Sequence, residues 1–569
     1  MANRSTARPD RAGPRWRRDL LRDRGGNVAL LFAFLSVPML MLGGAAIDYG
    51  FATRLETKLQ AATDATALLL CQTPLTTSQA DLNLLAQTTM TGAMGTANLV
   101  VDPLDITSNP RKITLTAHKL STTFFGGLTG TKRINPGAVS QCATPLPKTF
   151  EIALVLDNTG SMAESSGGQS KLKAVQTAAT TFVNYVATSP AFSSATKIAI
   201  VPFAAAVAVD PSAYRYASWI DQNGQSSYHW TNIIPSTPPL FKSRFDVFAK
   251  LQAVNRNWGW AGCLESLPYP FNVQDGTPST KDSYYVPLLA PDEPGDAKAG
   301  AAPFPVGSRS PTAYSYNSYI DDDNGGSCQN SSTYNTALGQ ACKYVNPKDA
   351  VSGSSVGIPN GPNFGCTTQP LQRLTSDTSA LKALIDKMAP LGSTNIHEGF
   401  MWGWRTLSPN SVFADGQPYA SSANSSNATT INKIIILMTD GTNSWGVNPN
   451  APTGSLYFAA GYFKNANNTT AKPRLTTAYQ NANLSDGDTA RKALDALTAE
   501  ACANAKAVNI SIYTIGFSIP SDPIDAAGQK LLKTCASADN QYFLANTSDD
   551  LIAAFQQIQA SIGALRLTQ

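Results

Sequence analysis

The apolar residues of the chain gather first near its N-terminus, in a stretch without a charged side chain. Val28 to Ile47 is uncharged throughout, within the segment NVALLFAFLSVPMLMLGGAAIDYG. A helix of about 20 residues is about 30 Å long, which is the thickness of the hydrocarbon core of a bilayer. The pattern therefore predicts a transmembrane helix at 26–48, with residues 28–47 inside the membrane.

Charge around this helix predicts its orientation. Residues 1–24 contain eight Arg and three Asp, and positively charged flanks stay on the cytoplasmic side. We therefore expect a basic cytoplasmic arm at 1–25 and export of the rest of the chain. A cleaved signal peptide is the alternative, because the small residues at 43–46 suit a peptidase and Arg17-Arg18 weakly matches a twin-arginine signal. The apolar run exceeds the usual length of roughly 7–15 residues in a signal peptide, which favours a retained anchor.

The next part of the chain predicts a small α+β unit. DYGFATRLETKLQAATDATALLL is rich in helix-forming residues and lacks proline, so the helix should continue beyond the membrane. KITLTAHKLSTTF at 112–124 is rich in threonine and β-branched residues with partial alternation, which is typical of a strand. We expect a helix and strand unit over 49–145, followed by a proline-containing linker.

From residue 149 onward, apolar runs typical of buried strands alternate with amphipathic helices. The helix at 170–189 carries an apolar stripe made by Leu172, Val175, Phe182, Val183 and Val186. The predicted strands lie at 149–157, 196–204, 432–440 and 509–517, and the further helices at 379–390, 490–508 and 549–562. Alternating strands and helices predict an α/β fold with a parallel sheet covered on both faces.

Composition narrows the possible partners and the compartment. Charged residues make up only 14% of the chain, and the net charge of +4 is less than that of the N-terminal arm alone. The body therefore lacks the basic excess of a nucleic-acid-binding protein, and we expect no nucleic acid as a partner. All eight cysteines follow the apolar segment, and an even number on the exported side predicts disulfides. Cys71–Cys142 and Cys502–Cys535 are the preferred pairs, since each pair falls within one predicted unit.

The ends of two predicted strands carry candidate metal ligands. LVLDNTGSM places Asp157, Thr159 and Ser161 at alternate positions after the first strand, and Asp440 ends the strand IIILMTD. The carboxyl ends of parallel strands meet at one edge of a sheet, where ligands bind. Carboxylate and hydroxyl oxygens without His or Cys select a hard cation such as Mg²⁺ or Ca²⁺. An ordinary strand-end turn is the alternative interpretation of Asp-Asn-Thr-Gly.

These motifs, together with LGSTNIHEG and ILMTDG, give residues 149–568 a resemblance to the von Willebrand factor A domain. The resemblance implies a Rossmann-like α/β fold with a central, mostly parallel sheet. In that family the first motif is Asp-x-Ser-x-Ser, and here Thr159 replaces the middle serine but keeps the hydroxyl. The implied metal-ion-dependent adhesion site would be formed by Asp157, Thr159, Ser161, Thr394 and Asp440. An acidic group of a protein partner would complete the coordination of the single ion.

Such a domain needs roughly 200 residues, a typical domain size, and this segment is about twice as long. The main insertion is expected at about 205–375, with smaller ones near 411–430 and 443–488. These segments are rich in Tyr, Ser, Asn, Gly and Pro, and four cysteines in the main insertion predict that it is folded. The insertions could set binding specificity, because binding residues gather on loops held by a rigid scaffold. A decoration without a role is the alternative.

The front of the chain has a resemblance of its own. RGGNVALLFAFLSVPMLMLGGAAIDYG, followed by LQAATDATAL, is similar to the N-terminal region of TadG-like proteins of Flp-pilus (tight adherence) assembly systems, over roughly residues 20–145. Related pilin-like members carry a glutamate five residues after the glycine cut by prepilin peptidase. Counting from Gly26, that position is Leu31 here, so we expect an unprocessed anchor.

Taken together, these features predict a single-pass protein of the bacterial inner membrane, with its C-terminal domain periplasmic or surface-exposed. It would bind one divalent cation and a protein partner, and pilus or secretion components are the expected partners. We expect no enzymatic activity. One alternative is a structural envelope protein with a vestigial metal site. The other is a metal-assisted hydrolase, for which Glu398 is the best candidate base.

Overall fold

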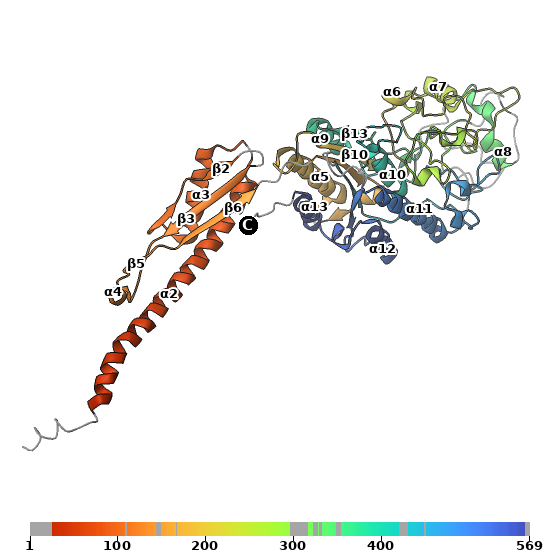
Figure 1. Cartoon of the computed structure of the whole chain (residues 1–569). Coiled ribbons are helices and arrows are strands. Elements are labelled where there is room, and N and C mark those ends of the chain that lie inside the picture. Colours follow the sequence, from red (N-terminus) through yellow and green to blue (C-terminus); the bar gives the residue numbers. More distant parts are fainter. Residues whose placement is uncertain are drawn as a thin grey trace, which may run out of the picture. The chain divides into compact units, whose positions relative to one another are not determined.

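The chain forms two compact units in a computed structural model (Figure 1). The first comprises residues 1–146 with 565–569, and the second comprises residues 147–564. The predicted basic arm at 1–25 and residues 144–148 of the linker lie outside the residues that the structure describes. The described residues are 26–74, 76–107, 111–143, 149–166, 168–295, 317–321, 328, 333–348, 354–419, 431–448 and 451–563.

One long helix dominates the first unit. Helix α2 (Gly26–Gln72) has 47 residues and contains Pro38, so the predicted continuation of the apolar helix is confirmed. Within the described residues, Leu30–Gln72 is the one helix that is long and apolar enough to cross a membrane, by length and composition. Its apolar side chains between Leu30 and Leu42 are largely exposed. These features fit a membrane anchor or a signal sequence.

The C-terminal half of α2 packs with α3 (Gln79–Met94) on a four-stranded antiparallel sheet. Strand β3 (Lys112–Lys119) alternates, and its buried residues Ile113, Leu115 and Ala117 join the core of this unit. The Cys71–Cys142 disulfide ties α2 to the sheet, which confirms the predicted pair. The remaining elements are β1 (Leu99–Val101), β2 (Asp105–Thr107) and β6 (Gly137–Ala143), and the hairpin of β4 (Ser121–Thr122) and β5 (Arg133–Ile134) with the short α4 (Gly126–Thr129).

The second unit is built on a six-stranded sheet that is parallel except for one edge strand. Its order is β13 (Gln372–Thr375), β10 (Lys197–Phe203), β7 (Phe150–Asp157), β14 (Asn432–Thr439), β15 (Ser511–Phe517) and β16 (Tyr542–Ala545), with β13 antiparallel. The predicted α/β class with a mostly parallel sheet is confirmed. In chain order the strands run 3-2-1-4-5-6, so the connections leave in opposite directions from β7 and β14. This switch point is where open α/β sheets bind ligands.

Helices cover both faces of this sheet, as β7 illustrates. Ile152, Leu154 and Leu156 face one core with α5 (Lys171–Thr188), α9 (Thr378–Lys387) and α13 (Ser548–Ile562). Ala153 and Val155 face the other core with α10 (Ile396–Leu407), α11 (Gly487–Ala507) and α12 (Ala526–Cys535). Cys502–Cys535 joins α11 to α12, as predicted.

The chain between β10 and β13 folds into a largely irregular body with its own buried residues. Its helices are α6 (Pro211–Tyr214), α7 (Arg244–Val254) and α8 (Tyr334–Gly339). Buried Glu265 pairs with Arg244 and with Arg474, which belongs to a later loop. Disulfides Cys263–Cys366 and Cys328–Cys342 close this body. Two short hairpins complete the unit: β8 (Ser165–Ser166) with β9 (Gln169–Ser170), and β11 (Ser354–Ser355) with β12 (Ile358–Pro359).

Candidate functional site

The candidate site lies at the carboxyl ends of the two central strands, β7 and β14. Asp157 is the last residue of β7, and Asp440 directly follows β14. The two strands pair in parallel from Phe150–Asn432 to Leu156–Met438. Both carboxylates therefore lie at the switch point of the sheet, where the sequence predicted a ligand site.

The loop after β7 is held by hydrogen bonds to the Asp157 carboxylate. The Thr159 amide donates to Asp157 Oδ1 at 2.8 Å, and the Thr439 hydroxyl donates to Asp157 Oδ2 at 2.6 Å. Thr159 Oγ1 lies 3.2 Å from Ser161 Oγ, which donates to Asp440 Oδ1 at 2.8 Å. This chain of polar contacts links the Asp-x-Thr-x-Ser motif to the second aspartate.

Thr394 reaches the same place from the loop before α10. The Gly160 amide donates to Gly392 O at 2.9 Å, and the Ser444 amide donates to Thr394 O at 2.9 Å. A side-chain carbon placed on Gly441 would lie 3.8 Å from the Thr394 hydroxyl and 4.0 Å from the Ser161 hydroxyl. The structure therefore brings together all five residues named from the sequence.

An open cavity of about 370 Å³ lies over these residues. Ser161, Thr394 and Asp440 line it, whereas Asp157 and Thr159 lie behind it and are buried. The other lining residues are Gly392, Ser393, Gly441, Thr442, Ser444, Asp522, Pro523 and Ile524. The cavity presents hydroxyl and carboxylate oxygens and little apolar surface, which suits a small, hydrated ion better than an apolar ligand.

Two charged side chains at the site were not named from the sequence. Lys171, the first residue of α5, has a fully buried side chain and donates to Asp440 Oδ2 at 2.8 Å. It also donates to Asp522 Oδ2 at 2.6 Å, and the side chain of Asp522 is 43% exposed. Asp522 follows β15, whose carboxyl end reaches the same edge of the sheet, and that position was the available signal. Lys171 gave no such signal, because a lysine at a helix start reads as a solvated residue.

Three carboxylates lie close together at the site, and the buried Lys171 ammonium is the positive charge beside them. Burial and the nearby Asp440 raise the pKa of Asp157. Burial also raises the pKa of Asp440, although Lys171 opposes this. Burial alone would lower the pKa of Lys171, but its two carboxylate partners outweigh burial and raise it. With all four groups ionised, three aspartates and one lysine carry a net charge of −2.

These residues fit a divalent cation. An ion with two charges would neutralise the remaining −2, and the hydroxyls of Ser161 and Thr394, with the buried Thr159 hydroxyl behind them, would add neutral oxygens to its surroundings. Within the described ranges, no group of three or more His, Cys, Asp or Glu side chains is arranged to hold a metal ion. Any metal at this edge would therefore depend on hydroxyl oxygens as well as carboxylates.

Glu398, the candidate base of the hydrolase alternative, lies elsewhere. It is buried on α10, where it accepts a hydrogen bond from the Ser266 hydroxyl and lies 3.9 Å from Arg405. It is not among the residues that line the cavity. In this arrangement Glu398 has no access to a substrate held over Asp440.

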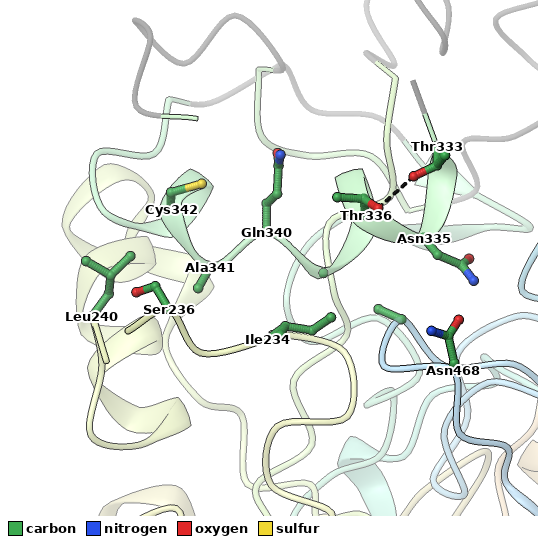
Figure 2. Close-up of a pocket in the computed structure, with 12 residues that line it drawn as sticks. Ile234, Ser236, Leu240, Thr333, Asn335, Thr336, Gln340, Ala341, Cys342 and Asn468 are labelled. Carbon is green, nitrogen blue, oxygen red and sulfur yellow. Dashed lines mark hydrogen bonds between the residues drawn. The ribbon is translucent and has the colours of Figure 1, made fainter. Parts of the chain in front are cut away.

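A second cavity, of about 610 Å³, lies between the body that joins β10 to β13 and a later loop that contains Ala466 and Asn468 (Figure 2). Ile234, Leu240 and Ala341 form an apolar wall, and Asn335 and Asn468 lie at the other end. Thr333 and Thr336 hydrogen-bond to each other at 2.6 Å along α8. None of its lining residues is charged, so it offers no carboxylate to a metal ion.

Comparison with known proteins gives one family and several solved structures. Residues 26–69 match the Flp pilus-assembly TadE/G-like family, Tad, which confirms the resemblance of the N-terminal segment. No curated protein matches the chain. The matched segment covers most of α2, including the apolar stretch, so the match is confined to the front of the chain.

Several of the similar solved structures come from pilus proteins. The pilus adhesin SpaC of Lactobacillus rhamnosus GG is 10% identical, with a TM-score of 0.27 over 82% of this chain and 34% of its own, so this chain spans about a third of its length. The von Willebrand factor domain of the pilus tip protein Mfa5 of Porphyromonas gingivalis is 12% identical, with a TM-score of 0.30 over 73% of this chain and 95% of its own. The adhesive tip pilin GBS104 of Group B Streptococcus agalactiae is 11% identical, with a TM-score of 0.32 over 73% and 100%. At such TM-scores the fold class is established by the sheet order rather than by these matches.

Proposed function

We propose that this protein is anchored in the bacterial inner membrane by α2, with its N-terminus in the cytoplasm and its second unit periplasmic or surface-exposed. The apolar stretch of α2, the arginines that precede it and the match to the Tad family support this placement. All eight cysteines form disulfides, which suits an oxidising compartment. Its place of action would be the assembly of an Flp pilus or adhesion at the surface.

The second unit would bind one Mg²⁺ or Ca²⁺ at the carboxyl edge of its sheet. Ser161, Thr394 and Asp440 would face the ion, with Asp157 and Thr159 supporting them from behind. When bound, the ion would supply a positive centre that attracts a carboxylate of a protein partner, such as a pilus or secretion component. We propose no catalytic step and no nucleic acid as a partner.

One observation carries this proposal: three oxygen-bearing side chains from three distant segments line one open cavity at the switch point. Ser161, Thr394 and Asp440 have no sequence proximity, so their convergence is a property of the fold. When the three aspartates and Lys171 are all ionised, the net charge of −2 around the cavity attracts a divalent cation.

Metal titration tests the proposal. Mg²⁺ or Ca²⁺ added to the full chain in detergent should raise the melting temperature of the second unit, because a ligand that binds only the folded state stabilises it. Asp157→Asn should abolish this rise. Asp386→Asn is the matched control, since Asp386 is an exposed carboxylate on α9, away from the cavity. An Asp157→Asn variant that responds as strongly as the control variant would contradict the assignment.

A structural protein without metal is the second candidate function, and Lys171 is the observation in its favour. Its buried ammonium already neutralises part of the charge on Asp440. If wild-type protein shows no response to either cation while pilus assembly or adherence survives Asp157→Asn at normal protein levels, this candidate replaces the first.

A further inference from the structure

A hairpin of the first unit lies against α2 where the apolar stretch ends. This aromatic hairpin consists of residues 121–134, with β4, α4 and β5, and Figure 1 shows α4 and β5 beside α2. Both oxygens of the Asp48 carboxylate accept hydrogen bonds from its backbone, from the Phe124 amide at 2.7 Å and the Phe125 amide at 2.9 Å. Asp48 is the first charged residue after Ile47, so the contact fixes the hairpin at this level of the helix.

The hairpin also contacts the apolar stretch itself. A side-chain carbon on Gly44 would lie 2.7 Å from Phe125 Cβ and 2.8 Å from its Cγ, so Phe125 packs where the helix has no side chain. Gly44 belongs to residues 28–47, and Asp48 lies one helical turn beyond it, about 6 Å along the axis. If α2 spans the bilayer, the hairpin therefore overlaps the last turn of the span.

The exposed side chains of this region include several aromatic rings. Phe124 is 74% exposed although its ring lies 5.2 Å from that of Phe51, and Tyr49 is likewise exposed. Residues 121–134 include Lys132 and Arg133 but no acidic residue. Aromatic rings with basic residues are the composition that membrane–water interfaces favour, because the rings enter the boundary region while the charges reach the headgroups.

We propose that the aromatic hairpin lies in the interface of the bilayer on the exported side, where Phe124 and its neighbours enter the headgroup region. This placement rests on the membrane anchoring proposed above. It gives each feature a physical reason. The exposed rings leave water, the basic residues meet lipid phosphates, and the Asp48 carboxylate is satisfied by two amides where water is scarce. The hairpin would hold α2 at a fixed depth and hinder its rotation.

Site-directed spin labelling of the full chain tests the proposal, because all eight native cysteines form disulfides and leave an introduced one for labelling. Phe124→Cys removes an exposed ring and keeps the amide that bonds Asp48. Leu84→Cys on α3, 67% exposed in the same unit, is the water-side control. Leu35→Cys, in the middle of the apolar stretch, is the membrane control. Each protein would be placed in phosphatidylethanolamine and phosphatidylglycerol vesicles.

Collision with oxygen and with a water-soluble nickel chelate reports the depth of each label. The label at 124 should have an oxygen-to-nickel collision ratio between those at 35 and 84. A ratio at 124 equal to that at 84, with 35 protected from nickel, would place the hairpin in water and overturn the proposal. A label at 124 shielded from both reagents would mean burial in a protein contact and would also overturn it. Nickel access at 35 would instead reject the anchor itself.

Discussion

Replacing Lys171 with methionine should destabilise the second unit in a way that a divalent cation repairs. The Lys171 ammonium donates to Asp440 and Asp522, and the side chains of Lys171 and Asp440 are both 0% exposed. Methionine keeps the unbranched, apolar length of the lysine stem but removes the charge. Asp440 then remains as a buried carboxylate that accepts a hydrogen bond from the Ser161 hydroxyl.

The expected magnitude follows from the burial of the pair. Removing one partner of a buried ion pair costs about 3–5 kcal/mol, because the other charge is left uncompensated. The open cavity beside Asp440 lets water approach, so we expect the lower end, about 3 kcal/mol. For a unit of roughly 420 residues, unfolding entropies of about 2.1 cal/mol/K per residue convert this into a fall of about 3 °C in melting temperature. If the bound cation restores about 2.7 kcal/mol of this lost stability, the Lys171→Met variant binds the cation about 100-fold more tightly than wild type does.

Calorimetry of both proteins across a series of Mg²⁺ and Ca²⁺ concentrations measures this effect. The gap in melting temperature between wild type and Lys171→Met should narrow as the cation is added. Lys433→Met is the matched control, because Lys433 forms a buried pair with Glu151 at the opposite end of the sheet. The melting temperature of Lys433→Met should lie below that of wild type by the same amount at every cation concentration. A Lys171→Met deficit that stays constant across the series would refute the reasoning, since the cation would then not replace the ammonium.

Two further predictions concern the site and the pH dependence of stability. Gly441→Ala should fold normally, since the added methyl meets only the Thr394 and Ser161 hydroxyls at ordinary contact distance. The methyl should nevertheless weaken the rise in melting temperature that cations cause. Gly276→Ala is the control, because its methyl meets nothing within 4 Å, and it should change neither folding nor the response to cations. Hydrogen bonding from Arg491 lowers the pKa of Asp525 to about 2. Because this folded-state pKa is depressed, its contribution is complete above pH 4 and is lost as the pH falls towards 2. The difference in unfolding free energy between wild type and Asp525→Asn should therefore shrink over that range, from a value of at most about 1 kcal/mol for a half-exposed pair.

The sequence predicted the elements whose pattern is strong and missed those without one. The four central strands are long, buried runs, and all four lie where predicted. Strands β13 and β16 have four residues each and lie at the sheet edges, so their half-buried residues form no marked apolar run. The apolar pattern alone did not mark helix α10, whose residues are all buried in the fold, the polar His397, Glu398 and Arg405 included.

Helix α10 also contains two glycines that weaken a helix prediction. A side-chain carbon on Gly399 would lie 2.5 Å from the Phe203 ring, and one on Gly403 would lie 2.3 Å from Val155. These glycines let the helix approach the sheet closely. The reason for them is a tertiary contact, which a single sequence does not display.

The residues of the candidate site likewise fall into those that the strand pattern predicted and those that it did not. Asp157, Thr159, Ser161 and Asp440 follow strand ends, so the order of the strands already predicts their proximity. Thr394 precedes a helix that the pattern did not reveal, and only the family resemblance pointed to it. Lys171 and Asp522 are joined by an ion pair across 351 positions of the chain, and such a contact follows from the packing of α5 rather than from any local motif.

The central place of β7 has a mechanical consequence. If the protein is anchored in the membrane and holds a partner over Asp440, a pulling force between the two would act on this unit near Phe150 and near Asp157. These residues lie at opposite ends of one strand. β7 pairs in parallel on both sides, from Glu151–Lys197 to Asp157–Phe203 and from Phe150–Asn432 to Leu156–Met438. Tension along such a strand loads both ladders in shear, so their hydrogen bonds must break together. An edge strand pulled apart from its neighbour could lose its hydrogen bonds one pair at a time. The unit should therefore resist force best along β7, between the end joined to the linker and the end at the candidate site.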